Sequence, residues 1–117
     1  MQVTTDEAAR LLGWPQFPDG WSLTAVTRLE KLAGFFMVKA NEIHAYRLAN
    51  YAGRWLTRQD IENITQPLIE KYGEVKTMVR TENKQGHKFV QRLGFMATHE
   101  ADGLTYYCTE RLSHARL

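Results

Sequence analysis

Apolar residues recur with two different periods along the chain, and the alternation of these periods predicts the order of the elements. Helical spacing follows a capping box at Thr4–Glu7 and a second one at Thr57–Asp60. In such a box, a side-chain oxygen and an acid three residues later satisfy the first free amides of a helix. We expect these helices to end at Gly13 and Gly73, and Pro67 to kink or divide the second one.

The strand-like segments occupy most of the remaining chain. Residues 22–34 fit a helical stripe as well as a strand. A strand is preferred there because the runs 35–40 and 42–48 that follow form a predicted hairpin. Further along, the pattern predicts a strand over 74–80, a helix over 84–93 and a hairpin of 95–100 with 104–110. This order predicts one α/β (α+β) domain over 1–117 with a mixed, mostly antiparallel sheet flanked by helices.

Composition narrows the possible functions. The chain has 117 residues, of which 44% are hydrophobic, which is enough for a folded core. Fifteen Lys and Arg against thirteen Asp and Glu give a formal charge of +2, so bulk attraction to nucleic acid is not implied. The single cysteine excludes an internal disulfide, and no Cys/His spacing resembles a zinc site. The apolar runs are far shorter than the roughly 20 residues of a membrane span, and no leader opens the chain. A reduced, cytoplasmic protein is expected.

The most specific local pattern covers residues 83–95, where an Asn precedes a basic helix that ends in Leu93-Gly94-Phe95. This pattern resembles the C-terminal motif of the GNAT superfamily, the acetyl-CoA-dependent N-acetyltransferases. The other predicted elements extend the resemblance over 22–112, with an N-terminal helix and an aromatic turn in 1–21 before it. The compact form is most similar to short GNAT-like proteins of tailed bacteriophages. A viral protein of the host cytoplasm or the virion is therefore implied.

The resemblance implies a transferase that moves an acetyl group from acetyl-CoA to an amine. In the family a backbone N–H polarises the acetyl carbonyl and a base accepts the amine proton. Acetyl-CoA would bind between the strands 42–48 and 74–80, with its pyrophosphate at a helix N-terminus and against the backbone of residues 53–56. The cofactor-binding residues that the resemblance implies are Leu48, Asn50, Gly53, Arg54, Trp55, Arg58, Asn83 and Lys88.

Three positions depart from the family pattern. Asn50 stands where the phosphate loop usually has Gln or Arg, and the bulky Trp55 stands where it has a small residue. Val90 occupies a position where the family often has a Tyr beside the leaving thiolate. Purely structural roles are open for the same segment: Gly53 as a turn, Trp55 as a packing residue, and Asn83 as a helix cap.

The strand 42–48 carries the candidate catalytic bases, Glu42 and His44. Either side chain is suited to accept a proton directly or through a water if its pKa lies near neutrality. Tyr106 and Tyr107 alternate on the last strand, so one should be in the core while the other is available to an acceptor. Cys108 is interpreted as a buried small apolar residue.

Two other functions compete with the enzyme. A catalytically inactive GNAT-like fold would serve as a phage structural, assembly or host-protein-binding module, which is what the departures at Trp55 and Val90 favour. Residues 5–13 also resemble the first helix of excisionase-type winged helix-turn-helix proteins. The following segment 14–18 contains two prolines and cannot continue as a recognition helix, so nucleic acid is not expected as a partner. The acceptor, a small molecule or a protein amine, stays open, as does a homodimer.

Overall fold

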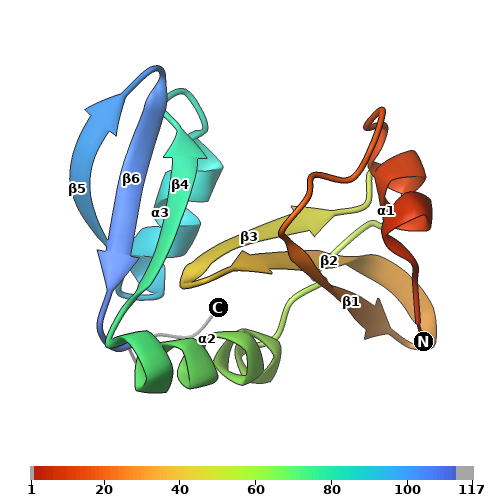
Figure 1. The fold of residues 1–117 in the computed structure, drawn as a ribbon, viewed down its shortest axis with the longest axis horizontal. Coiled ribbons are helices and arrows are strands. Elements are labelled where there is room, and N and C mark those ends of the chain that lie inside the picture. Colours follow the sequence, from red (N-terminus) through yellow and green to blue (C-terminus); the bar gives the residue numbers. More distant parts are fainter. Residues whose placement is uncertain (1, 113–117) are drawn as a thin grey trace. The chain divides into compact units, whose positions relative to one another are not determined.

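The computed structural model describes residues 2–112, which contain six strands and three helices (Figure 1). Hydrogen bonds join the strands in the order β1-β2-β3-β4-β6-β5, mostly with antiparallel neighbours. The predicted α+β class with a mixed sheet is therefore confirmed. In chain order the elements are α1 (Thr5–Leu12), β1 (Ser22–Arg28), β2 (Lys31–Lys39), β3 (Glu42–Arg47), α2 (Arg58–Tyr72), β4 (Val75–Arg80), α3 (Lys84–Arg92), β5 (Met96–Ala101) and β6 (Leu104–Thr109).

The chain forms two compact units, each with its own set of internal contacts. The first unit comprises the residues up to Lys39 together with His44–Leu56, and the second comprises Ala40–Ile43 together with the residues from Thr57 onward. The start of β3 therefore belongs to the second unit and its remainder to the first. Within the described residues, no helix is long and apolar enough to cross a membrane.

The core of the first unit is built around β2, whose residues 33–37 are all buried. Because successive side chains of a strand point to opposite faces, both faces of β2 must be covered. On one face Phe35 packs with Ala8 of α1 and with Leu48, which follows β3. On the other face the ring of Phe36 lies 6.5 Å from the Trp55 ring, centroid to centroid.

Gly34 permits a close approach at the centre of this unit. A Cβ at position 34 would overlap both the Tyr46 carbonyl oxygen and the ring of Trp55. Any larger residue must therefore displace backbone as well as an aromatic side chain. Trp55 thus has a packing role in the first unit, against β2.

The ambiguous segment 22–34 contains β1, a tight turn and the beginning of β2. Leu29 and Glu30 have φ values of 51° and 67°, so the chain reverses there through a left-handed pair. The preference for a strand is confirmed for Ser22–Arg28. The next strand begins at Lys31 rather than at residue 35, because this turn already supplies the reversal.

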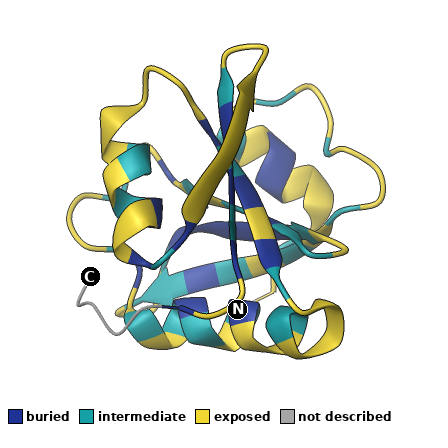
Figure 2. Ribbon diagram, turned by 90° about the vertical axis from the view of Figure 1, so that its left-hand side faces the viewer, coloured by how far each residue is buried: buried dark blue, intermediate teal, exposed yellow. Residues whose placement is uncertain are grey.

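In the second unit, helix α3 packs against one face of β4 and β6. Val75, Thr77 and Val79 alternate with more exposed neighbours along β4. Gly86 of α3 approaches that buried face, where a Cβ would lie 2.8 Å from a Val79 methyl carbon. Tyr107 of β6 points to the same face, and its hydroxyl lies 2.7 Å from His87 Nδ1 of α3. The edge strand β5 is exposed along its whole length (Figure 2).

Helix α2 begins at the predicted capping box and continues through Pro67 to Tyr72. The expected division of this helix at Pro67 is wrong. Proline removes one amide from the helix, and a helix of fifteen residues keeps the rest of its hydrogen-bond ladder on either side. Pro67 is also exposed, so its ring does not compete with core packing.

Candidate functional site

A cavity of about 320 Å³ lies within the second unit, and its lining includes Lys76 and Met78, which alternate along β4 with the buried Val75 and Val79. The strand register explains which side chains meet there. Glu42 of β3 pairs in parallel with Lys76 of β4, and Lys76 pairs with Cys108 of β6. Paired residues point to the same face, so these three side chains form one row across three strands, and all three line the cavity.

A second row forms the apolar part of the cavity. Met78 of β4 pairs with Tyr106, and Tyr106 pairs with His99 of β5. The rings of Tyr106 and His99 are stacked, with centroids 4.3 Å apart and planes 5° apart. A flat aromatic surface beside a thioether is suited to hold an apolar or aromatic ligand group.

Acidic groups determine the electrostatic character of this cavity. Burial raises the pKa of the Cys108 thiol above its ordinary value, and the carboxylates of Glu74 and Glu110 raise it further. Cys108 is therefore protonated at neutral pH and is a poor nucleophile. It is half-buried rather than fully buried as predicted, because its strand alternates and position 108 faces the cavity.

The two candidate bases lie in different environments. Glu42 is half-buried at the beginning of β3, in the second unit, and lines the cavity. Next to it the parallel strands are held together, since Lys76 N–H donates to Asn41 O at 2.8 Å and the Thr77 hydroxyl donates to Ile43 O at 2.7 Å. Rigid backbone therefore positions Glu42.

His44 belongs to the first unit and to an aromatic cluster. Its ring centroid lies 5.4 Å from that of Trp21 and 6.3 Å from that of Tyr46. Trp14 in turn meets Tyr46 edge to face at 5.1 Å. These contacts give His44 a packing role on β3.

The residues in and beside the predicted phosphate loop range from exposed to buried. Gly53 has a φ of +89°, and no described atom lies within 4 Å of where its Cβ would be, so a ligand can approach the backbone there. Leu48 is buried in the core of the first unit, whereas Asn50 and Arg54 are exposed. The Trp55 ring packs on β2.

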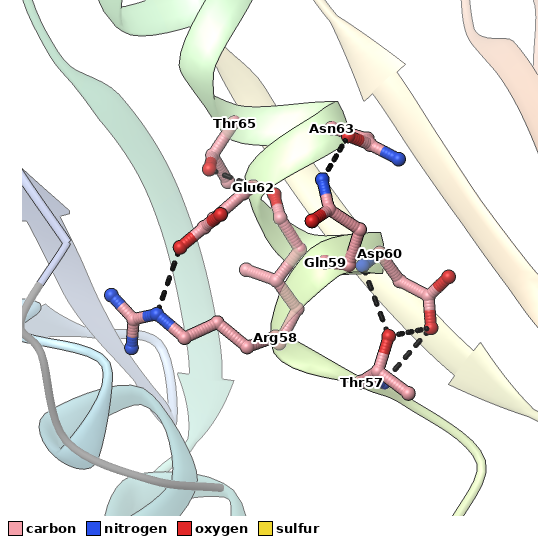
Figure 3. A network of polar contacts seen from close by, with 8 residues as sticks. Thr57, Arg58, Gln59, Asp60, Glu62, Asn63 and Thr65 are labelled. Atoms are coloured by element: carbon pink, nitrogen blue, oxygen red, sulfur yellow. Dashed lines mark hydrogen bonds and ion pairs between the residues drawn. The ribbon is translucent and has the colours of Figure 1, made fainter.

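A carboxylate already occupies the N-terminus of α2 (Figure 3). Asp60 Oδ2 accepts from the Thr57 backbone N–H at 2.8 Å and from the Thr57 hydroxyl at 2.9 Å. Arg58 donates through Nε to Glu62 at 2.9 Å. The helix end still favours an anion, yet a phosphate would meet the negative charge of Asp60 there.

Helix α3 uses its predicted cofactor residues structurally. Asn83 caps the helix, since its side-chain oxygen accepts from Gly86 N–H at 3.0 Å. This is the structural role left open for it. Val90 is 8% exposed and belongs to the core of the unit, while Lys88 is exposed.

The last strand divides its two tyrosines as predicted. Tyr107 is buried in the core and Tyr106 is half-buried, and both residues contribute to the lining of the cavity. Glu74, Met78 and His99 are site residues that the sequence reasoning missed. Alternation along β4 and β6 would have grouped Met78 with Tyr106 only if the register between these strands had been known.

The chain was compared with protein families, curated proteins and solved structures. No family model, no curated protein and no solved structure matches the chain. Function must therefore be argued from the site itself. Among residues 2–112, no three His, Cys, Asp or Glu side chains are grouped so that they could hold a metal ion.

Proposed function

We propose that the chain is an acetyl-CoA-dependent N-acyltransferase of GNAT type that acetylates an amine. The observation that carries the proposal is the position of Glu42. This carboxylate begins the strand that pairs in parallel with β4, and it lines a cavity that also contains Tyr106. The order of β3, α2, β4, α3 and the β5–β6 hairpin supports the proposal, since it is the order that the family resemblance implies.

The chemistry needs a proton acceptor beside an amine, and Glu42 supplies one. An amine enters the cavity as an ammonium ion, and only its neutral form is a nucleophile. Glu42 takes up the proton directly or through one water, and Tyr106 lies within the same cavity to orient the amine. When bound, acetyl-CoA supplies the acetyl thioester that the amine attacks.

Some features of the predicted acetyl-CoA site favour binding of the cofactor, and one neighbouring residue disfavours it. The open backbone at Gly53 suits a close approach by phosphate. The Trp55 ring packs against β2, which directs it away from the position where it would block the phosphate loop. Asp60 opposes binding, because its carboxylate is hydrogen-bonded at the N-terminus of α2. These features support a site of modest affinity.

Calorimetric titration with acetyl-CoA tests this proposal. We expect micromolar binding by the native chain, and about two- to fivefold tighter binding by Asp60→Asn, which removes the charge but keeps an acceptor for the cap. Glu42→Gln is the matched control, since it changes a carboxylate away from the phosphate loop and should leave the affinity unchanged. The absence of heat and of any thermal shift at millimolar ligand would contradict the proposal.

A second candidate function is a non-catalytic binding module for a virion or host protein. The observation that favours it is the structural use of three predicted cofactor residues: Trp55 packs against β2, Leu48 is in a core, and Asn83 caps α3. The same titration separates the two functions. A chain that binds no acetyl-CoA would be this module, and its protein partners would then be sought by affinity capture.

A further inference from the structure

We propose that the cavity of the second unit binds a primary ammonium group that carries an aromatic or similarly flat apolar body. This names the acceptor class of the proposed transferase and in that sense rests on the proposed function. The amine can be titrated without acetyl-CoA, so a result that contradicts the amine site can be told apart from one that contradicts the transferase.

The size of the cavity sets the size of the ligand. A volume of about 320 Å³ is at the lower end of the range typical of small-molecule sites, which begins near 300 Å³. A phenyl ring with a two-carbon amine chain fits within this volume.

The shape of the apolar part favours a flat group. Tyr106 and His99 form a stacked pair with an interplanar angle of 5°, and the hydroxyl of Thr98 is tied to the Tyr106 carbonyl oxygen at 3.2 Å. The same hydroxyl lies 3.0 Å from His99 Nδ1, a contact that orients the imidazole ring. Met78 completes this side of the cavity, and thioethers make favourable contacts with aromatic rings.

The charged groups select a cation. Glu42 and Glu74 are half-buried in the lining, whereas Lys76 is exposed and able to extend its ammonium into solvent. His99 is the other titratable base in the lining, and it is stacked on Tyr106. The raised pKa of Cys108 supports this polarity, because Glu74 and Glu110 both disfavour a negative charge at that sulfur.

Glu74 is the residue that we expect to hold the ammonium. Its backbone carbonyl accepts from Asn41 Nδ2 at 3.2 Å, which fixes the residue at the beginning of β4. Its side chain lines the cavity together with Cys108, and a carboxylate forms a stronger hydrogen bond with an ammonium than with a neutral thiol.

Titration of the full chain with 2-phenylethylamine, followed by NMR without acetyl-CoA, tests the proposal. The uncharged control ligand is 2-phenylethanol, which has the same ring and chain. We expect the amine to bind at least about tenfold more tightly than the alcohol, and Glu74→Gln to remove about tenfold of that affinity. Lys76→Gln is the matched control variant, and we expect it to bind the amine more tightly because it removes a cation.

A second probe distinguishes a free aromatic amine from a lysine side chain. Nα-acetyl-lysine methylamide presents the same ammonium on an aliphatic stem, and we expect it to bind more weakly than 2-phenylethylamine. Equal binding of the amine and the alcohol, or no effect of Glu74→Gln in a variant that keeps its native spectrum, would overturn the ammonium site. Tighter binding of the lysine derivative would overturn the flat apolar body. Tyr106→Ala should weaken the amine and the alcohol alike.

Discussion

Strands β2 and β4 lie in different units and differ in how many of their faces are buried. Residues 33–37 of β2 are buried on both faces of the strand, by α1 on one side and Trp55 on the other. Along β4, burial alternates, and α3 packs against the face that carries Val75, Thr77 and Val79. The opposite face of β4 retains Lys76 and Met78, which line the cavity.

This difference indicates where function can be placed in so short a chain. A strand that is buried on both faces contributes stability, and polar groups on it are costly. A strand with one uncovered face can present a row of polar and aromatic side chains while its other face holds the fold together. The candidate site accordingly lies on β4 and β6 and not on β2.

The largest expected effect comes from opening a cavity beside β2. Phe35 is fully buried, so we expect Phe35→Ala to lower the free energy of unfolding by about 3–5 kcal/mol. Met96→Ala on the exposed strand β5 is the control, since Met96 is 73% exposed and its loss should cost about 0.5 kcal/mol or less. Urea denaturation of both variants measures the difference, and equal losses would show that β2 is not the core of its unit.

A smaller effect is expected from the two faces of β6. Tyr107→Phe removes a hydroxyl that lies 2.7 Å from His87 Nδ1 and accepts from Gln91 Nε2 at 3.3 Å. The imidazole is held from both sides, since its Nε2 lies 3.0 Å from the Thr81 carbonyl oxygen, and the substitution removes the contact at Nδ1. We expect a loss of about 1 kcal/mol in thermal or urea unfolding.

Tyr106→Phe provides the matched comparison on the other face of the same strand. Its ring stays stacked on His99 without the hydroxyl, and we expect stability to change by less than about 0.5 kcal/mol. A larger loss for Tyr106→Phe than for Tyr107→Phe would reverse the assignment of the covered and uncovered faces.

The smallest effect concerns the reactivity of Cys108. Because burial and then Glu74 raise its thiol pKa, the thiolate fraction near pH 8 is below that of an ordinary cysteine, and alkylation by iodoacetamide should be slow. The rate should rise only at higher pH, and Glu74→Gln should move the profile to lower pH because it removes a negative charge. Urea-unfolded protein should show the ordinary profile. An unshifted profile in Glu74→Gln would contradict the acidic character of the cavity.

Most of the fold could be predicted from the sequence because the signals for its helices and strands lie within a few residues of each element. Both capping boxes, the final hairpin and the alternation of Tyr106 and Tyr107 are confirmed. The start of β2 at Lys31 was missed because a left-handed turn at Leu29 and Glu30 contains no glycine, which is the usual signal for such a turn. The continuity of α2 at Pro67 was missed because the remaining backbone hydrogen bonds of a fifteen-residue helix maintain the helix despite one proline.

The site was less predictable than the fold because it depends on register. Glu42 was identified from its strand alone, yet its neighbours in the cavity include Lys76 of β4, Cys108 of β6 and Glu74, which directly precedes β4. Nothing local in the sequence pairs Glu42 with Lys76, because parallel strands are joined through a helix and not through a turn. The packing of Trp55 against Gly34 was hidden for the same reason, since it brings together residues twenty-one positions apart in sequence.

The most direct test of the central claim is the rate of CoA thiol release from acetyl-CoA with 2-phenylethylamine as the acceptor. We predict turnover by the native chain, with the rate of Glu42→Gln lowered by about 100-fold, because a general base typically contributes 10²–10⁴. The binding of acetyl-CoA should be the same in both proteins. No release above the uncatalysed rate, or equal rates for the native chain and Glu42→Gln, would contradict the assignment of Glu42 as the base of a transferase.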